Sequence, residues 1–219
     1  MFCSTTLSAP NAQGIRLEFV DVDLEYNHRY LFDYLIIFDG PDCLAPRLGV
    51  AFGQKHQMTF SSQQNRVSLL FISDYEMQKA GFKLIYRPET LQDQWKRNNE
   101  IEPIYQHILK NCGEELNESS SNIIFWRGIH EANTLCIWRI TNNFGGTITL
   151  KIEELKFKTR SGSLRILDGR DCGAEVIHIF VQNTPSFNRK LRGSSNTMTV
   201  VLSAPGEEGN IFNATLSFT

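Results

Sequence analysis

The chain has 219 residues, of which 41% are hydrophobic and 21% are charged, and its formal net charge is −2. This composition is ordinary for a globular protein of one large or two small domains, and the charge argues against DNA or RNA as a partner, because nucleic-acid-binding proteins carry basic surfaces. No apolar run reaches the roughly 18 to 20 residues of a transmembrane helix, and residues 1–6 lack the basic and apolar regions of a signal peptide.

The first predicted strand covers residues 15–24. Apolar residues alternate with charged ones at Ile15, Leu17 and Phe19, and the alternation continues in the opposite phase from Val20. A change of phase within one strand indicates an extra residue in the ladder. We therefore expect a β-bulge near Phe19 and Val20.

A central buried strand is predicted over residues 31–38, which are apolar, aromatic and β-branched and lead into an Asp-Gly turn. Asp33 lies at the beginning of this run. Glu25 precedes it by eight residues, and Asp74 follows the next predicted buried strand, residues 67–72. If the fold brings these three carboxylates together, they form the outline of a site for a hard cation.

The β pattern stops after a strand predicted over residues 81–86 and begins again near residue 111. Residues 91–110 contain Asn, Pro and charged residues, which predict a linker with one or two helical turns over residues 103–110. The second half repeats the first, because Asp39-Gly40 and Asp168-Gly169 stand at matching places, 129 residues apart. The strands expected there lie near residues 136–140, 148–152, 164–167, 200–203 and 212–218.

Five short motifs of the first half together resemble the signature of the CUB domain family. They are Glu25, Phe32 to Leu35, Phe38 to Gly40, Phe71 to Asp74, and Gly81 with Phe82. The resemblance implies an all-β fold of two tandem antiparallel β-sandwich domains of jelly-roll-like topology, residues 1–90 and 111–219, with the linker 91–110 between them. It also implies an extracellular or cell-surface location.

A calcium site is implied by the same resemblance. In the calcium-binding CUB domains the ligands would correspond to Glu25, Asp33 and Asp74, with oxygens around Glu76 and water completing the shell. The alternative is that these acids are solvated caps of strand ends. In the second domain Glu154 keeps the first acid, but Gly162 and Ala204 replace the two aspartates, so we expect Ca²⁺ in the first domain only.

The five cysteines, at positions 3, 43, 112, 136 and 172, match no zinc spacing. Dispersed cysteines in β-rich modules favour disulfides and an oxidising compartment, although a cytosolic protein with buried thiols remains the alternative. The resemblance implies a Cys112–Cys136 disulfide and identifies Cys3 as the second cysteine of its module. We then expect that the first cysteine and roughly 25 residues of the module are absent, so that the chain is an incomplete copy of a longer protein or its gene model starts late.

Three further expectations concern individual residues. Tyr30 and Phe52 stand where the family has a second disulfide, which suggests an aromatic contact in place of that bridge. Cys43 and Cys172 pair with each other, pair with sequence outside the chain, or remain free. Asn117 and Asn213 begin N-glycosylation sequons.

No catalytic motif is recognised in the sequence. His130-Glu131 lacks the second histidine of a zincin helix, and there is no Gly-x-Ser-x-Gly elbow. We therefore expect a non-catalytic module. The resemblance implies that its partner is an extracellular protein and that the first domain binds a basic residue of that partner in a calcium-dependent way; the alternative is that calcium only stabilises the fold. The alternatives are a non-catalytic CUB segment of an astacin/tolloid-like or complement-type protease, and a glycan-binding β-sandwich.

Overall fold

The computed structural model describes residues 2–27, 31–74, 76–90, 109–119, 123–128, 133–186, 188–205 and 207–219. Every regular element in these residues is a β-strand, and none of them forms a helix long and apolar enough to cross a membrane. The chain divides into two compact units, Met1–His107 and Ile108–Thr219. Residues 91–108, which cover most of the predicted linker and its helical turns, lie outside the described residues.

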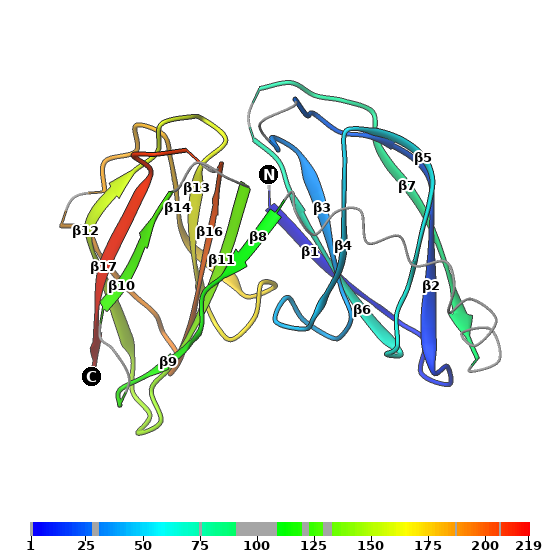
Figure 1. The fold of residues 1–219 in the computed structure, drawn as a ribbon. Helices are drawn as coiled ribbons and strands as arrows, with labels where there is room; N and C mark the ends of the chain where they lie inside the picture. The colour runs from blue at the N-terminus through cyan, green and yellow to red at the C-terminus, as the bar shows by residue number, and fades with distance from the viewer. Residues whose placement is uncertain are drawn as a thin grey trace. The chain divides into compact units, whose positions relative to one another are not determined.

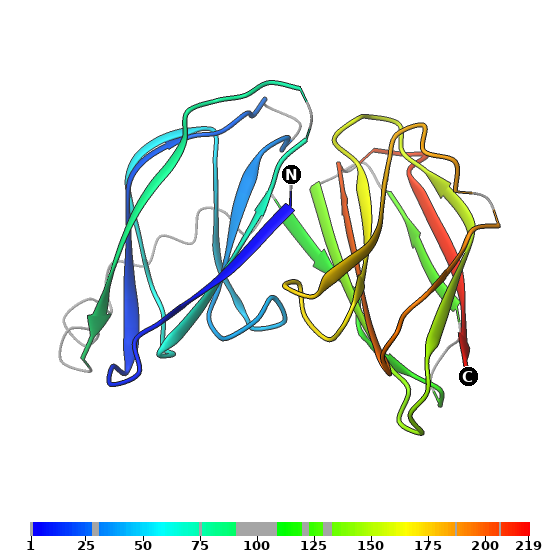
Figure 2. The same ribbon diagram turned by 180° about the vertical axis from the view of Figure 1, so that it is seen from behind.

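The first unit is a sandwich of two antiparallel sheets (Figures 1 and 2). One sheet has the strand order β1-β6-β3-β4, and the other has the order β5-β2-β7. The strands are β1 (Phe2–Ser8), β2 (Gly14–Asp23), β3 (Tyr34–Phe38), β4 (Arg47–Phe52), β5 (Gln54–Ser61), β6 (Arg66–Ile72) and β7 (Gly81–Glu89).

Strand β3 is the buried centre of its sheet, as the sequence predicted. All five of its residues are buried, and it pairs with β6 on one side and β4 on the other. The core lies between the sheets, where Leu35 and Ile37 of β3 meet Leu17 and Phe19 of β2. Because both faces of β3 are covered, its sequence is continuously apolar rather than alternating.

The bulge predicted in β2 is present. Phe19 pairs with Leu84 of β7 and Asp21 pairs with the very next residue, Lys83, so Val20 is the extra residue. Val20 is 43% exposed, whereas Phe19 and Val22 both face the core. The strand therefore keeps an apolar inner face on both sides of the bulge, and Val20 itself does not belong to that face.

The second unit repeats this sandwich and adds three strands at its beginning. One sheet has the order β14-β13-β16-β11-β8, with β9 also pairing with β11, and the other has the order β10-β17-β12-β15. Its strands are β8 (Leu109–Cys112), β9 (Glu115–Asn117), β10 (Ile123–Arg127), β11 (Asn133–Thr141), β12 (Ile148–Lys156), β13 (Ser163–Asp168), β14 (Glu175–Val181), β15 (Lys190–Arg192), β16 (Thr197–Ala204) and β17 (Ile211–Phe218). Both units are thus β-sandwiches, which confirms the predicted fold class.

Strands β8 and β9 differ from the prediction of purely antiparallel sheets. Both pair with β11 in the parallel direction, at Leu109 to Cys112 and at Glu115 to Asn117. β8 also begins at Leu109, inside the range predicted as linker. The reason is local: Gly113 has a φ of +99° and a Cβ there would clash with the backbone of Ile137, so β8 and β9 follow β11 closely as two short pieces.

The Asp-Gly turns after β3 and β13 have the same construction. Asp39 accepts backbone N–H groups of Gln63 and Gln64 at 3.1 to 3.2 Å, and Asp168 accepts those of Ser194 and Ser195 at 2.7 and 3.3 Å. A Cβ on Gly40 would lie 2.5 Å from Ala45, and one on Gly169 would lie 2.7 Å from Ala174. The 129-residue repeat seen in the sequence is therefore a repeat of hydrogen bonds and of close contacts.

Candidate metal centre

Four acidic residues lie at one end of the first sandwich, where three strands begin or end. Asp33 directly precedes β3, and Asp74 follows β6, which pairs with β3 through Tyr34 and Ile72. Glu25 follows β2, and its carbonyl oxygen accepts the N–H of Asp33 at 3.1 Å. The pairing of β3 with β6 therefore brings together acids that lie 41 residues apart in the sequence.

Backbone N–H groups donate to the carboxylates of Asp33, Asp74 and Glu25, and these bonds, together with the one from Asp33 N–H to the Glu25 carbonyl, connect the segments in a ring. Asp33 Oδ1 accepts the N–H of Asp74 at 3.3 Å, and Asp74 Oδ1 accepts the N–H of Glu76 at 2.9 Å. Glu25 Oε2 accepts the N–H of Met77 at 3.2 Å, which closes the ring. The four residues predicted as ligands are thus linked through backbone N–H groups, and we call this set the acidic ring.

Negatively charged side chains lie close together in the acidic ring, and this affects the pKa of Glu25. The pKa of Glu25 is raised above its ordinary value of 4.5, first by burial and then by the negative charge of Asp74, with smaller contributions from Asp33 and Glu76. The hydrogen bond from Met77 acts in the opposite direction. Asp33 is only 5% exposed. Burying one carboxylate beside others costs free energy unless a positive charge compensates it.

The carboxylates are not arranged as a coordination shell. Among the described residues, no three His, Cys, Asp or Glu side chains are gathered so that they could hold a metal ion. Carboxylate oxygens of Glu25, Asp33 and Asp74 accept backbone N–H groups instead. The donor chemistry nevertheless suits a hard divalent cation, since all four side chains offer carboxylate oxygen, and burial and then the charge of Asp74 raise the pKa of Glu25. To bind an ion, the carboxylates would have to turn from the amides toward it.

Tyr26 and Met77 form an exposed apolar rim beside the acidic ring. Met77 is 54% exposed, and the Tyr26 ring packs against Phe52 with 4.9 Å between the centroids. The predicted contact of Phe52 with Tyr30 falls on a residue outside the described ones. A neighbouring aromatic residue thus contacts Phe52, which the spacing of the lost cysteines did not indicate.

The matching end of the second sandwich is closed by apolar side chains. A Cβ on Gly162 would collide with the ring of Phe157, which is itself buried, and Ala204 is buried as well. Glu154 is exposed. Phe157 was not predicted from the sequence, because a lone aromatic residue five residues before Gly162 does not show where its ring lies. An apolar ring occupies the place where the first unit has Asp33.

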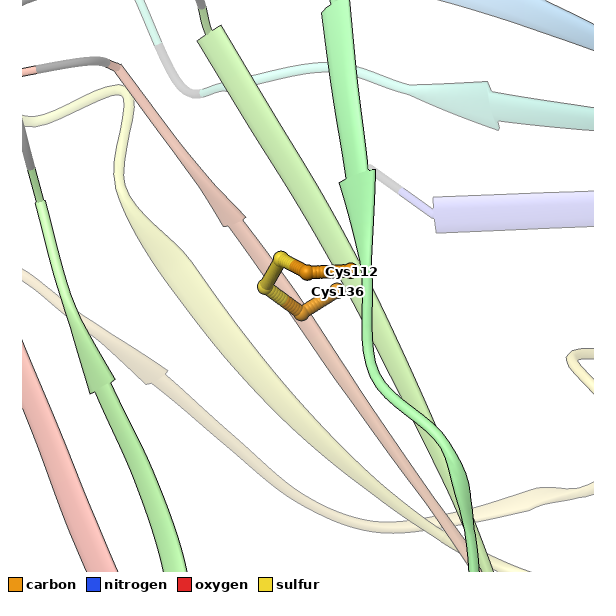
Figure 3. The surroundings of a disulfide bond; sticks show 2 residues. All are labelled: Cys112 and Cys136. Carbon is orange, nitrogen blue, oxygen red and sulfur yellow. A yellow bond between two sulfur atoms is a disulfide. The ribbon is translucent and has the colours of Figure 1, made fainter.

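Cys112 and Cys136 form a disulfide between β8 and β11 (Figure 3). Their Cα atoms are 4.2 Å apart, and the two residues are direct partners in the parallel ladder. Cys3 is free and exposed, and Cys43 and Cys172 are each disulfide-bonded. Cys3 pairs with Phe71 of β6 in the same way that Cys136 pairs with Leu202 of β16, which agrees with the matching positions of β1 and β11.

The two sequon asparagines have different surroundings. Asn117 is the last residue of β9, and its Oδ1 accepts the N–H of Ser119 at 2.9 Å. Asn213 lies in the middle of its sheet, on β17 between β10 and β12. Its neighbours Phe212 and Ala214 face the core, so the Asn213 side chain is on the outer face.

Comparison with known proteins agrees with this architecture. The family model of the CUB domain matches residues 1–86. Tolloid-like protein 2 of Homo sapiens is 28% identical over 187 residues, which cover 84% of this chain and 17% of that protein. Cubilin of Homo sapiens is 26% identical over 171 residues, which cover 76% of this chain and 4% of that protein. The chain therefore spans less than a fifth of the length of these relatives.

Among solved structures, the CUB1-EGF-CUB2 domain of human MASP-1/3 aligns over 100% of this chain and 93% of its own, with 14% identity and a TM-score of 0.37.

Proposed function

We propose that this chain, whose residues 1–86 belong to the CUB domain family, is a non-catalytic extracellular interaction module that binds a protein partner through a calcium site in its first unit. The observation that carries this proposal is the acidic ring, in which Glu25, Asp33, Asp74 and Glu76 are linked by hydrogen bonds. Three of these residues stand at the positions where the calcium-binding CUB domains have acids.

The calcium ion would be held by carboxylate oxygens of Glu25, Asp33 and Asp74, with Glu76 beside them. It would supply the positive charge that the crowded acids lack and would fix the segments before β3 and after β6. Support comes from the pKa of Glu25, which is raised by burial and then by the negative charge of Asp74. Because the ion binds the folded state and not the unfolded chain, it should stabilise the first unit.

The partner would present a Lys or Arg side chain to the same acids. Carboxylate oxygens that are not fully used by the ion can accept charge-assisted hydrogen bonds from an ammonium or guanidinium group. Tyr26 and Met77, which are exposed beside the ring, could pack against the apolar stem of that side chain. The acidic ring therefore offers carboxylates for the charged group of a Lys or Arg, and Tyr26 and Met77 beside it offer an apolar surface for the stem of that side chain.

Retention on immobilised lysine tests this mechanism. The full chain should be retained in calcium and released by a chelator, since the free carboxylates are then loosely held. Asp74→Asn should abolish retention, and Glu154→Gln, which removes the exposed acid at the matching place of the second unit, should leave it unchanged. Retention that persists in chelator, or an equal loss in both variants, would contradict calcium-dependent recognition of a basic group.

An extracellular location is part of the proposal. Disulfide-bonded cysteines and the sequons at Asn117 and Asn213 fit an oxidising, glycosylating compartment. We propose that both asparagines carry N-linked glycans.

A second candidate is that the chain is a non-catalytic segment of a larger tolloid-like protein. The alignment with Tolloid-like protein 2, over 84% of this chain and 17% of that protein, supports it. Sequence flanking the 219 residues decides between the candidates, because a peptidase domain on either side favours the second.

A further inference from the structure

Two exposed apolar side chains stand side by side on the outer face of β10. Ile123 is 57% exposed and Phe125 is 59% exposed, whereas Ile124 between them is buried and Trp126 packs against the core. This alternation assigns Ile123 and Phe125 to the face that points away from the core. A large exposed phenyl ring on a strand at the end of its sheet favours unwanted association unless something covers it.

The register of β10 with β17 places the sequon directly beside this pair. Phe125 is the cross-strand partner of Asn213, and Ile123 is the cross-strand partner of Thr215. Side chains directly opposite each other in an antiparallel pair have Cβ atoms about 4.5 to 5.5 Å apart. The two apolar residues therefore flank the two residues that define the sequon, although these strands are about 90 residues apart in the sequence.

The surroundings of Asn213 are apolar on one side only. On the other side it pairs with Glu154 of β12, which is exposed and charged. Its own side chain takes part in no hydrogen bond within the described residues. A bulky group attached to Asn213 would therefore find an apolar surface toward β10 and a solvated one toward β12.

We propose that the glycan on Asn213 packs its first sugar rings against Phe125 and Ile123 and covers this apolar pair. The inference rests on the glycosylation proposed above. In that modification the Nδ2–H bond of Asn213 is replaced by a bond to C1 of the sugar, and the lipid-diphosphate carrier of the oligosaccharide leaves as its acid. The C–H faces of the sugar rings are apolar, and they can stack on the phenyl ring as other apolar groups do.

Asn117 provides the internal control. Its Oδ1 already accepts the N–H of Ser119, and its ladder partner is Thr141 of β11. A glycan on Asn117 has no aromatic cross-strand partner. Removing that glycan should therefore not change the effect of Phe125→Thr on the melting temperature. Asn213→Gln is preferable to a change at Thr215, because the Thr215 hydroxyl donates a hydrogen bond to Glu153 at 2.9 Å.

The test is a thermal double-mutant cycle on the full chain, secreted from eukaryotic cells. Peptide mass spectrometry first establishes whether Asn213 is occupied. Phe125→Thr should then lower the melting temperature of the glycosylated protein by about 4 °C, and should have little effect in the Asn213→Gln background. In the Asn117→Gln background the loss should remain as large as in the otherwise unchanged protein.

Binding of an environment-sensitive apolar dye gives a second measurement that does not depend on stability. Asn213→Gln should increase dye fluorescence, and the added change Phe125→Thr should remove the increase. Equal temperature shifts in both backgrounds, with Asn213 occupied, would overturn the packing. An unoccupied Asn213 would overturn the glycosylation itself, so the two failures are distinguishable.

Discussion

Glu25 combines hydrogen bonds within the acidic ring with a raised pKa. Its carbonyl oxygen binds the N–H of Asp33, its carboxylate binds the N–H of Met77, and its pKa is raised by burial and by three neighbouring acids. A carboxyl group whose pKa is raised by folding favours the folded state below its ordinary pKa of 4.5. That contribution is lost as the pH rises through the higher folded pKa, where the charged form must be accommodated.

Glu25→Gln should therefore raise the melting temperature of the first unit in chelator at neutral pH. The glutamine removes the repelled charge but keeps an oxygen that can accept the Met77 N–H. In excess calcium the order should reverse, since the wild-type carboxylate then binds the ion. Melting curves between pH 4.5 and 8 in chelator measure the first effect, and a difference that does not grow as the pH rises would contradict it.

His178 in β14 should make the second unit sensitive to mild acid. Burial, and then the positive charge of Arg189, lower its pKa below 6.5. The centroid of its ring lies 4.4 Å from that of the Phe180 ring. The unfolded chain then binds a proton on His178 at a higher pH than the folded unit does, so stability is lost as the pH falls from 6.5 toward the lower folded pKa. His178→Gln should flatten this part of the curve of melting temperature against pH, and an unchanged slope would contradict the assignment.

The acids of the candidate site could be predicted from sequence because their spacing relative to two apolar strands is itself a pattern. The side chains that surround these acids could not be predicted in the same way. The packing of Tyr26 against Phe52 was not predicted, and the predicted partner of Phe52, Tyr30, lies outside the described residues. Phe157 fills the space beside Gly162 in the second unit, and a single aromatic residue in a loop gives no signal of which way its ring points.

At the scale of elements, periodicity predicted some strands, among them β2, β3 and β6, and missed others of similar length, including β1, β5 and β14. β2 was predicted together with its bulge, because a change of phase is visible in the alternation of Ile15 to Val22. β8 and β9 are three or four residues long and pair in parallel with β11. Their position depends on Gly113 and on the disulfide, neither of which has a periodic signature. Short strands of this kind are set by tertiary contacts rather than by local pattern.

The Cys112–Cys136 disulfide should hold β8 in place and stabilise the second unit. Closing a loop of 24 residues restricts the unfolded chain, and the chain-entropy estimate is about 3 kcal/mol. The double change Cys112→Ala and Cys136→Ala should remove an unfolding free energy of this order. Urea unfolding followed by tryptophan fluorescence measures it, since Trp126 and Trp138 both pack in this unit.

Cys3→Ser is the matched control for that change, because Cys3 is exposed and free although it stands at the position that matches Cys136. It should leave the urea midpoint unchanged. If the double alanine variant behaved like Cys3→Ser, the disulfide would have no part in stabilising the second unit.

At the scale of the whole molecule, two units of one architecture carry different chemistry at matching ends. The sequence repeat of 129 residues predicted the shared turns at Asp39 and Asp168, and the structure has them. It also predicted that Asp33 and Asp74 have no acidic counterparts in the second unit, where Gly162 lies beside Phe157 and Ala204 is buried. The fold is thus repeated, while the acidic ring belongs to the first unit.

Calorimetric titration of the full chain with calcium tests this assignment most directly. Wild type should bind one ion per chain, Glu154→Gln should bind one as well, and Asp33→Asn should bind none, because it removes the buried charge at the centre of the acidic ring. An absence of binding to wild type or undiminished binding to Asp33→Asn would contradict a calcium site in the first unit. A second ion of equal affinity would contradict its restriction to that unit.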